Sequence, residues 1–457
     1  MKMQIRNRYL VGLCKLNSIH VFSLLTSFLC GTLFTYIYIQ KSSILISTQK
    51  YLIPYESLLI NNVKTNLPSI TSSDTCGTWQ QSYINLHRSI LNGSLPPRYL
   101  ISVAVEAGLA DRLTGTLTEF FFALLTNRAF QIVTYGTLPR FEAAFLTPNI
   151  NWSRSIVNDE LISNLKFTYR GQRGYSGDRS YPSHINTSLY WPMYLVNDDG
   201  ENEFFCSSNV SKYPLNHEDV QTLFVSSNRG RVIHLFDNPY HRFQLFQMGL
   251  HPATVIRCAF DFLFSPTESL KKAMSREFSI LSSSDILKIS INIRVGDAVF
   301  DPNADSQTNL SSYDPYFNCA STIESYARLP NQIVIWYFTS DSLKLRQLVK
   351  EKYGEKILTE DKLRYVHGDC GDSPAKRYGN CTNESQDFSI RMSAGQIYAM
   401  SMCDYHVVSA QSGFGRFAAS LSNHWHSVYQ IHDNINRSCT IDDHDTLEYF
   451  TTNGAGI

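Results

Sequence analysis

A turn rich in serine and glycine, Ser409–Arg416, has the residue types and the position of a phosphate-binding turn. It follows an apolar run and opens a segment with helical spacing, Phe414–Leu421, so it connects a strand to a helix. The first N–H groups of a helix lack acceptors within the helix, and the helix dipole favours an anion beside them. The residues expected to contact such an anion are Ser409, Ser412, Gly413, Phe414, Gly415 and Arg416. An ordinary turn with a serine cap looks the same, so neighbouring chemistry must decide between the two.

A second group of polar residues follows an earlier predicted strand, Tyr99–Val105. Apolar residues at helical spacing predict a helix over Arg112–Thr126, and Ala129–Val133 is typical of the next strand. This is a βαβ unit, which binds ligands at the carboxyl ends of its strands. The groups expected at that edge are Glu106, Gly108, Asp111 and Arg112.

These side chains indicate possible acid–base chemistry. Glu106 is a candidate general base, because it is a carboxylate at a strand end beside a cleft. Asp111 stands where a helix N-cap would stand, and that structural role competes on equal terms with a functional one. Arg112 is expected to face the crevice.

The second half of the chain repeats the alternation of strands and helices. A strand over Ile286–Ile293 runs into Arg294, which therefore emerges at a carboxyl strand end, where ligands bind in such sheets. The other predicted elements are strands at Gln332–Phe338, Leu363–Val366, Tyr405–Ser409 and Ser427–Ile431, and helices at Ser342–Tyr353 and Ser389–Met402. The pattern predicts an α/β fold with two Rossmann-like domains, residues 76–285 and 286–457, that face a cleft.

Length and charge narrow the class of protein. A chain of 457 residues is too long for one compact core, so two domains are expected. Lys plus Arg and Asp plus Glu number 40 each, and no basic block stands out, which argues against nucleic acid as a partner. The stretch Phe141–Lys272 has an irregular pattern, and its aromatic segment Asp237–Gly249, with His241 and Arg242, fits an acceptor surface, a core or a solvated face.

The N-terminus predicts a membrane anchor. An uncharged run, Val21–Ile39, is long enough to cross a bilayer, and four basic residues precede it. Positive charge on that side predicts a cytosolic tail at residues 1–18, an uncleaved transmembrane signal anchor at 19–40 and a lumenal stem at 41–75. A cleaved signal peptide is the alternative, which the long basic lead disfavours.

The cysteines and glycosylation motifs agree with a lumenal catalytic part. Eight cysteines follow the anchor, which permits disulfides in an oxidising compartment; Cys370 and Cys381 are the favoured pair, and Cys403 is interpreted as a buried thiol. Asn-x-Ser/Thr motifs begin at Asn92, Asn151, Asn186, Asn209, Asn309, Asn380, Asn383 and Asn436, all after the anchor. The sequence contains no CxxC motif, so a zinc knuckle is not expected.

Three motifs in order resemble the GDP-fucose fucosyltransferases of the GT-B fold, which include plant xyloglucan-type, α1,2/α1,6 and protein O-fucosylating enzymes. They are Gly108–Arg112, Asn292–Asp297, and Ser409–Arg416 after Cys403-Asp-Tyr405. The family signature is H-x-R-R-x-D; Asn292 stands at its His, Arg294 at its first Arg and Asp297 at its Asp. Val295 stands at the second Arg and departs from the pattern.

The resemblance implies roles for these residues. Arg294 would grip the β-phosphate of GDP, where a bidentate cation offsets the charge of the leaving group. Because Val295 carries no charge, Arg416 or Arg112 would supply any second cation. Asp341 or Asp404 would read the guanine, although a structural role for Asp404 is equally expected.

The function that follows is a metal-independent, inverting transfer of L-fucose from GDP-fucose to a glycan or glycoprotein in the Golgi lumen. Either Glu106 or Asp111 takes the acceptor proton, or the leaving phosphate does. No cofactor or metal is expected, and Asp443-His-Asp445 is interpreted as a chance match to a DxD metal motif. The alternatives are another donor, such as GDP-mannose, and a catalytically silent membrane-anchored carbohydrate-binding protein.

Overall fold

The computed structural model describes residues 76–104, 107–134, 138–153, 190–195, 209, 221–227, 230–364, 382–422, 424, 427–432, 437 and 439–446. All the described residues belong to one compact unit, Cys76–Ile457. The predicted anchor, Glu106 and the Cys370/Cys381 pair lie outside the described residues. Among the described helices, none has the length and apolarity needed to span a bilayer.

The first half of this unit contains a parallel sheet with the strand order β2-β1-β5-β4. Its strands are β1 (Tyr99–Val103), β2 (Ala129–Val133), β4 (Tyr190–Leu195) and β5 (Thr222–Ser227). Helix α3 (Leu109–Leu125) connects β1 to β2, which confirms the predicted βαβ unit. The helix begins at Leu109 with Gly108 as N-cap, so the expected N-cap role of Asp111 is wrong: Asp111 lies in the first turn.

Further helices cover this half, and the elements within the irregular stretch Phe141–Lys272 are short. The helices that cover this half are α2 (Trp79–Leu91), α6 (Arg242–Gln247), α7 (Val255–Leu263), α8 (Glu268–Ala273) and α9 (Ser275–Leu281). A two-stranded antiparallel pair joins β3 (Phe145–Leu146) to β6 (Ser265–Pro266). Elements this short give too few repeats for a periodicity to be detected.

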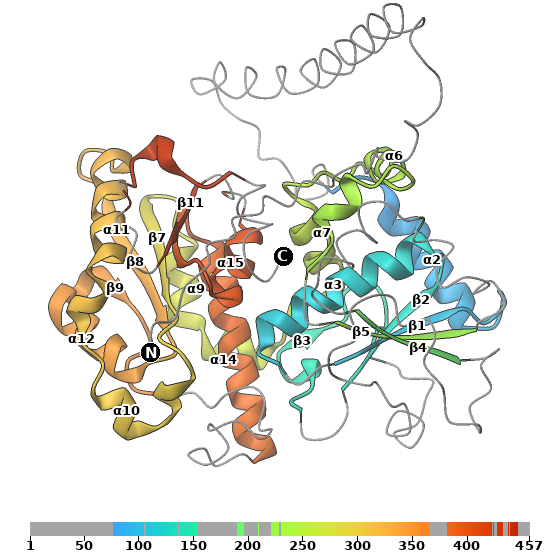
Figure 1. The fold of residues 1–457 in the computed structure, drawn as a ribbon, viewed down its shortest axis with the longest axis horizontal. Coiled ribbons are helices and arrows are strands. Elements are labelled where there is room, and N and C mark those ends of the chain that lie inside the picture. The colour runs from blue at the N-terminus through green and yellow to red at the C-terminus, as the bar shows by residue number, and fades with distance from the viewer. Residues whose placement is uncertain are drawn as a thin grey trace, which may run out of the picture. The chain divides into compact units, whose positions relative to one another are not determined.

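The second half holds a five-stranded parallel sheet with the order β11-β10-β7-β8-β9. Its strands are β7 (Ile286–Ile293), β8 (Ile333–Ser340), β9 (Ile357–Leu358), β10 (Tyr405–Ser409) and β11 (Val428–Ile431). The helices are α10 (Pro302–Ser306), α11 (Asp314–Ala327), α12 (Leu343–Tyr353), α14 (Asn383–Ser401) and α15 (Gly413–Ser420) (Figure 1). The strand expected at Leu363–Val366 is displaced: β9 forms earlier, and Leu363 and Arg364 are not in a strand.

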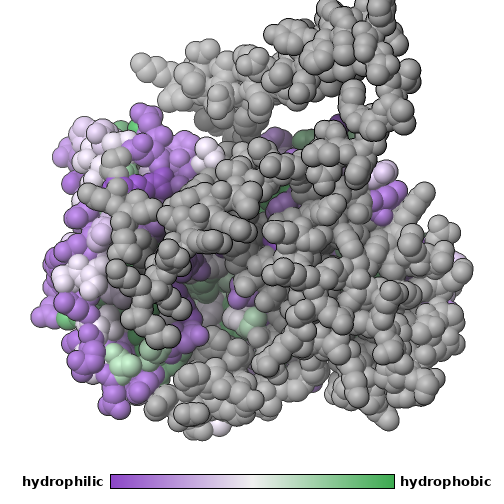
Figure 2. All heavy atoms as spheres, viewed as in Figure 1, coloured by the Kyte–Doolittle hydropathy of each residue, from purple (hydrophilic) through white to green (hydrophobic). Residues whose placement is uncertain are grey.

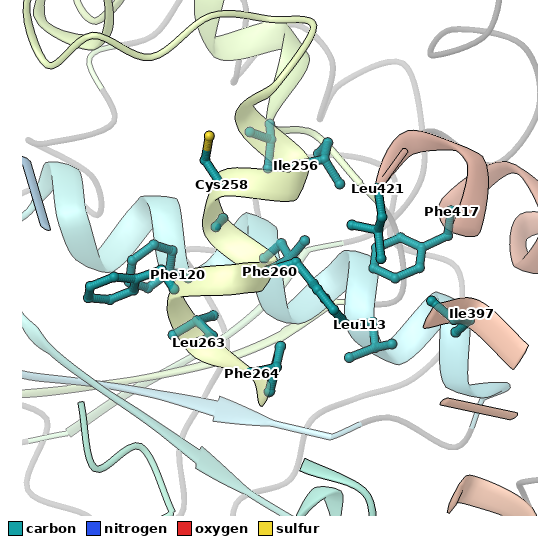
Figure 3. Packing of buried hydrophobic residues seen from close by; sticks show 14 of the residues in the cluster. Leu113, Phe120, Ile256, Cys258, Phe260, Leu263, Phe264, Ile397, Phe417 and Leu421 are labelled. Atoms are coloured by element: carbon teal, nitrogen blue, oxygen red, sulfur yellow. The ribbon is translucent and has the colours of Figure 1, made fainter. Parts of the chain in front are cut away.

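One hydrophobic cluster joins helices from both halves of the unit. Figure 3 shows Phe260 of α7 beside Leu113 of α3 and Phe417 of α15, and the ring centroids of Phe260 and Phe417 are 5.8 Å apart. A separate cluster packs α11 and α12 against the second sheet. Because α3 and α15 share one core, their first turns are held against each other. The outer surface of the second half is mainly hydrophilic (Figure 2).

Two disulfides cross-link segments that are distant in sequence. Cys76 pairs with Cys258 and Cys319 with Cys439, which are 182 and 120 residues apart. The first ties the start of the folded unit to α7, and the second ties α11 to the chain beyond β11. Cys403 is a buried free thiol, as predicted, and burial raises its pKa.

Candidate functional site

A pocket of about 290 Å³ lies where the carboxyl ends of β7 and β8 meet the first turns of α3 and α15. Strand register places these ends together, since Asn292 is paired with Thr339 on one side and Val408 on the other. The expected site residues on its wall are Gly108, Asp111, Arg112, Asn292, Arg294, Asp341, Ser412, Gly413 and Phe414. The fold therefore gathers most of the predicted groups at one place.

The first turn of α15 has the geometry of an anion site. Ser412 is the N-cap: its Oγ accepts a hydrogen bond from the N–H of Gly415 at 3.4 Å and donates to Oδ1 of Asn292 at 3.2 Å. Gly413 and Phe414, whose N–H groups are the first of the helix, both line the pocket. Those N–H groups are the donors that would meet a phosphate.

Gly415 has a packing role instead of a ligand-binding one. A Cβ at this position would lie 2.4 Å from Oδ1 of Asn292, so any larger residue would push α15 away from β7. Asn292 itself is fixed, because its Nδ2 donates to Oγ1 of Thr339 at 2.9 Å. Gly415 does not line the pocket.

Arg294 presents a fixed cation at the end of β7. Its Nη1 lies 2.8 Å from Oδ2 of Asp341, and its Nη2 is bonded to Oδ1 of Asp297. Asp341 also accepts hydrogen bonds from the N–H groups of Val295 at 2.8 Å and Gly296 at 3.0 Å. The carboxylate of Asp341 therefore holds both the loop and the arginine, while the Arg294 side chain stays 36% exposed and lines the pocket.

Ser409 supports this loop from beneath. Its Oγ accepts from the N–H of Arg294 at 3.0 Å and lies 2.8 Å from Oη of Tyr316. Ser409 is buried and does not line the pocket, so its hydroxyl orients the strand end instead of facing a ligand.

The start of α3 forms the facing wall. Nη2 of Arg112 donates to the carbonyl of Pro139 at 2.8 Å, and the guanidinium lies 4.6 Å from the ring of Phe141. The residue is 2% exposed, and burial lowers the pKa of this guanidinium to about 10. Asp111 also lines the pocket, with Oδ1 3.1 Å from where a Cβ on Gly413 would be.

Two expected donor contacts are placed elsewhere. Arg416 is fully buried on α15 and does not line the pocket, because it points into the packed side of that helix. Asp404 precedes β10 at the amino edge of the sheet, where it accepts from the N–H of Lys288 at 2.9 Å. Parallel strands carry the pocket at their carboxyl edge, so Asp404 is at the wrong end to read a base there.

The sequence interpretation missed one wall of the pocket, the face of α14. Ser389, Ser393 and Gln396 line it at positions i, i+4 and i+7 of the helix. A polar stripe at that spacing on a helix whose other faces are buried was a usable signal. The other pocket residues that were not anticipated are Leu109, Ala110, Pro139, Ile293, Phe300, Thr339, Ser340, Ile390 and Gln411.

No cluster of three or more His, Cys, Asp or Glu side chains suited to a metal occurs among the described residues. The carboxylates of the Asp443-His-Asp445 segment have structural partners. Asp443 caps the turn that begins at Thr440, and Asp445 accepts from the N–H of Gln430 at 2.7 Å and pairs with Arg437.

No family model matches the sequence, and no curated protein does. Solved structures do match the fold. A point mutant of Arabidopsis thaliana FUT1 in complex with GDP has a TM-score of 0.53 and 16% identity, over 79% of this chain and 80% of that one.

Two further fucosyltransferase structures are more distant. NodZ α-1,6-fucosyltransferase soaked with GDP-fucose has a TM-score of 0.40 and 12% identity, over 71% of this chain and 93% of that one. POFUT1 in complex with GDP has a TM-score of 0.37 and 9% identity, over 75% of this chain and 100% of that one. The chain is thus an α/β protein with parallel sheets, built on the fold of the plant fucosyltransferase FUT1.

Proposed function

We propose that this chain is a fucosyltransferase that moves L-fucose from GDP-fucose to a hydroxyl group of a glycan acceptor, with inversion and without a metal. The observation that carries the proposal is that Arg294 and the first residues of α15, Gly413 and Phe414, line the same pocket. A cation and a helix N-terminus together suit a diphosphate. The FUT1 structure that shares this fold was solved with GDP.

The geometry supports a simple displacement. The bond between the sugar C1 and the β-phosphate oxygen breaks, the acceptor oxygen bonds to C1 from the opposite face, and the electron pair of the broken bond stays on GDP. Arg294 and the N–H groups of Gly413 and Phe414 stabilise that charge as it develops. The acceptor proton leaves to a carboxylate or to the departing phosphate.

The structure shows where the side chain of Val295 lies, the residue that stands at the second Arg of the family signature. The side chain of Val295 packs against the hydrophobic cluster of the second sheet and is not on the pocket wall. Arg112 donates to a carbonyl and Arg416 is buried in α15. The charge of the leaving group is therefore stabilised by Arg294 and by backbone N–H groups, without a second arginine in the position that the family signature would give it.

The proposal includes the cellular location of the enzyme. A signal anchor at Val21–Ile39 would hold the enzyme in the Golgi membrane with the folded unit in the lumen. Two disulfides suit that oxidising compartment, and the motif asparagines Asn92, Asn151 and Asn309 are exposed. Protease protection in sealed Golgi vesicles tests the topology, since digestion of the folded unit from outside would contradict it.

The function is tested with the full-length chain in detergent micelles. We expect hydrolysis and transfer from GDP-fucose, weak or no use of GDP-mannose and UDP-galactose, and no effect of a chelator. A preference for GDP-mannose would change the donor but keep the chemistry. Binding of glycans without binding of any GDP-sugar would favour the silent carbohydrate-binding alternative.

A further inference from the structure

Asp305, in the short helix α10, is a buried carboxylate that does not line the pocket. It accepts hydrogen bonds from the hydroxyl of Ser342 and from the N–H of Lys344, the latter at 3.2 Å. Its Oδ2 also lies 3.0 Å from Nη2 of Arg364. Burying a charge is costly even when the charge is paired, and apolar packing often stabilises a fold as well or better. A buried and paired carboxylate is therefore a reason to look for a role beyond stability.

The contacts of Asp305 are one half of a reciprocal contact between two strand-end turns. Asp305 belongs to the chain that follows β7, and its partner Ser342 follows β8 as the N-cap of α12. In the opposite direction, Asp341 follows β8 and accepts hydrogen bonds from the N–H groups of Val295 and Gly296, which follow β7. Each turn thus supplies one carboxylate to the other. Because Asp341 and Ser342 are adjacent in the chain, a displacement of Ser342 would move Asp341 with it.

Arg364 adds a contact to the segment that runs from Arg294 to Asp305. Its Nη1 donates to the carbonyl of Val299 at 3.0 Å, while its Nη2 pairs with Asp305. The next residue, Phe300, lines the pocket, and its ring centroid lies 5.7 Å from the guanidinium carbon of Arg294. The segment that begins with Arg294 is consequently held at its far end as well as at its start.

We propose that Asp305 is a positioning residue for Arg294, on which it acts through Ser342 and Asp341; the proposal rests on the proposed GDP-fucose chemistry. Asp305 does not line the pocket, so its effect reaches a ligand through other residues. Its contacts hold Asp341 where that carboxylate fixes both the loop and the guanidinium of Arg294. A cation stabilises a leaving group only when it is aimed at the developing charge, and a misplacement of about 1 Å can cost a factor of about 10².

The test is a double-mutant cycle with the full-length chain in detergent micelles, measured as kcat and KM for the hydrolysis of GDP-fucose. Asp305→Asn keeps the size of the side chain and an oxygen for Ser342, but it loses the charge that pairs with Arg364. We expect kcat to fall about tenfold, with KM for the donor within about twofold of the wild type. In an Arg294→Ala background the same change should have almost no further effect, because the group that Asp305 positions is gone.

Asp445→Asn is the matched control. Asp445 is also a buried carboxylate that accepts from a backbone N–H, that of Gln430 at 2.7 Å, and pairs with an arginine, Arg437. Gln430 lies in β11, an edge strand that β10 separates from β7. We therefore expect Asp445→Asn to lower the denaturation midpoint, as Asp305→Asn does, and to leave kcat unchanged.

The outcomes separate this proposal from the function beneath it. Equal factors of loss in the two backgrounds would show that Asp305 does not act through Arg294, and a comparable fall of kcat in Asp445→Asn would assign the effect to a general loosening of the fold; either result overturns the proposal. If the wild type hydrolyses GDP-fucose and Asp305→Asn does so at the same rate, this proposal alone fails. If the wild type does not use GDP-fucose, the proposed function fails and this proposal fails with it.

A second variant keeps the test open if Asp305→Asn does not fold. Arg364→Lys keeps a positive charge beside Asp305 but cannot hold Asp305 and the carbonyl of Val299 with one planar fork. It is compared in the same two backgrounds, and the same loss of kcat that disappears in Arg294→Ala is expected. A loss that persists there would contradict the proposal.

Discussion

Arg294 and Arg112 both line one pocket, and their surroundings differ in kind: Arg294 directly follows β7, whereas Arg112 lies in the first turn of α3, the helix after β1. Arg294 is 36% exposed and is held by two carboxylates, which leave its guanidinium facing the pocket. Arg112 is 2% exposed and is bonded to a backbone carbonyl. One wall presents charge to a ligand and the other uses charge to hold the fold, so strand-end position alone does not assign a role.

The largest expected effect follows from the exposed arginine. Arg294→Ala removes the cation that stabilises the leaving diphosphate, so we expect transfer to fall by about 10²–10³-fold. Arg294→Lys keeps the charge but loses the bidentate fork, and should fall between the alanine variant and the wild type. Steady-state transfer from GDP-fucose measures both effects.

The control for this change is another arginine outside the pocket. Arg328 is half exposed and pairs loosely with Glu324 at 4.0 Å, so Arg328→Ala should leave transfer unchanged. Near-normal transfer by a folded Arg294→Ala protein would remove Arg294 from the mechanism and leave the first turn of α15 as the remaining support for the site.

The bounds of the strands could be predicted from the sequence better than the directions and partners of the side chains that follow them. The strand β10 was predicted with the bounds that the structure has, because its apolar run is bordered by polar residues. The burial of Arg112 was not predictable, because its partner Pro139 is 27 residues away and belongs to a segment without periodicity. Local patterns give strand ends, whereas the direction of a long side chain depends on tertiary contacts.

The same limit applies to Arg416, Asp404 and the wall formed by α14. Arg416 follows Gly415 directly, so the motif places it near the anion, but the helix turns its side chain into the core. Asp404 was counted with the site because the family resemblance places an acid there, yet it precedes the strand. Distance along the chain does not report which edge of a parallel sheet a residue occupies.

A smaller effect should come from the turn itself. In Gly413→Val the new Cβ would lie 3.1 Å from Oδ1 of Asp111, and its methyl groups would cover the first N–H donors of α15. We expect GDP to bind about tenfold more weakly, which corresponds to ~1.4 kcal/mol. Calorimetric titration with GDP measures the change.

Gly108→Ala is the matched glycine control for the other wall. A Cβ at Gly108 meets no heavy atom within 4 Å, and the residue has φ of −59°, which alanine accepts. Its GDP affinity should remain that of the wild type. Equal losses in the two variants would show that any added carbon in the pocket weakens GDP, and that the first turn of α15 has no special part.

Substitution of Arg112, which is buried and bonded to the backbone, should change the stability of the fold. Arg112→Met keeps much of the apolar stem but leaves the carbonyl of Pro139 without its donor, so we expect the free energy of unfolding to fall by about 1–3 kcal/mol. Chemical denaturation measures this change. GDP affinity of the folded fraction should stay constant; a loss of affinity without a loss of stability would give Arg112 the ligand role that the sequence first suggested.

The last prediction concerns Glu119, which lies on the same helix as Arg112 and is also buried. Burial raises the pKa of its carboxyl well above the usual value, although hydrogen bonds from Ser102 and the backbone of Ser227 oppose the shift. The folded protein therefore keeps a proton that the unfolded chain releases above pH ~4.3. By linkage, the stability of the fold should decrease as pH rises from that point toward the folded pKa, by up to about 1.4 kcal/mol per pH unit.

Glu119→Gln makes this group permanently neutral, and its denaturation midpoint should lose that part of the pH dependence while Arg112→Met retains it. Glutamine keeps a hydrogen-bonding group beside Ser102, so the variant should fold. Identical pH profiles for the wild type and Glu119→Gln would mean that the carboxyl is ionised inside the fold. Then α3 would carry two buried charges, those of Arg112 and Glu119. The surroundings of Arg112 and Arg294 would then differ only in how far each charge is exposed to solvent.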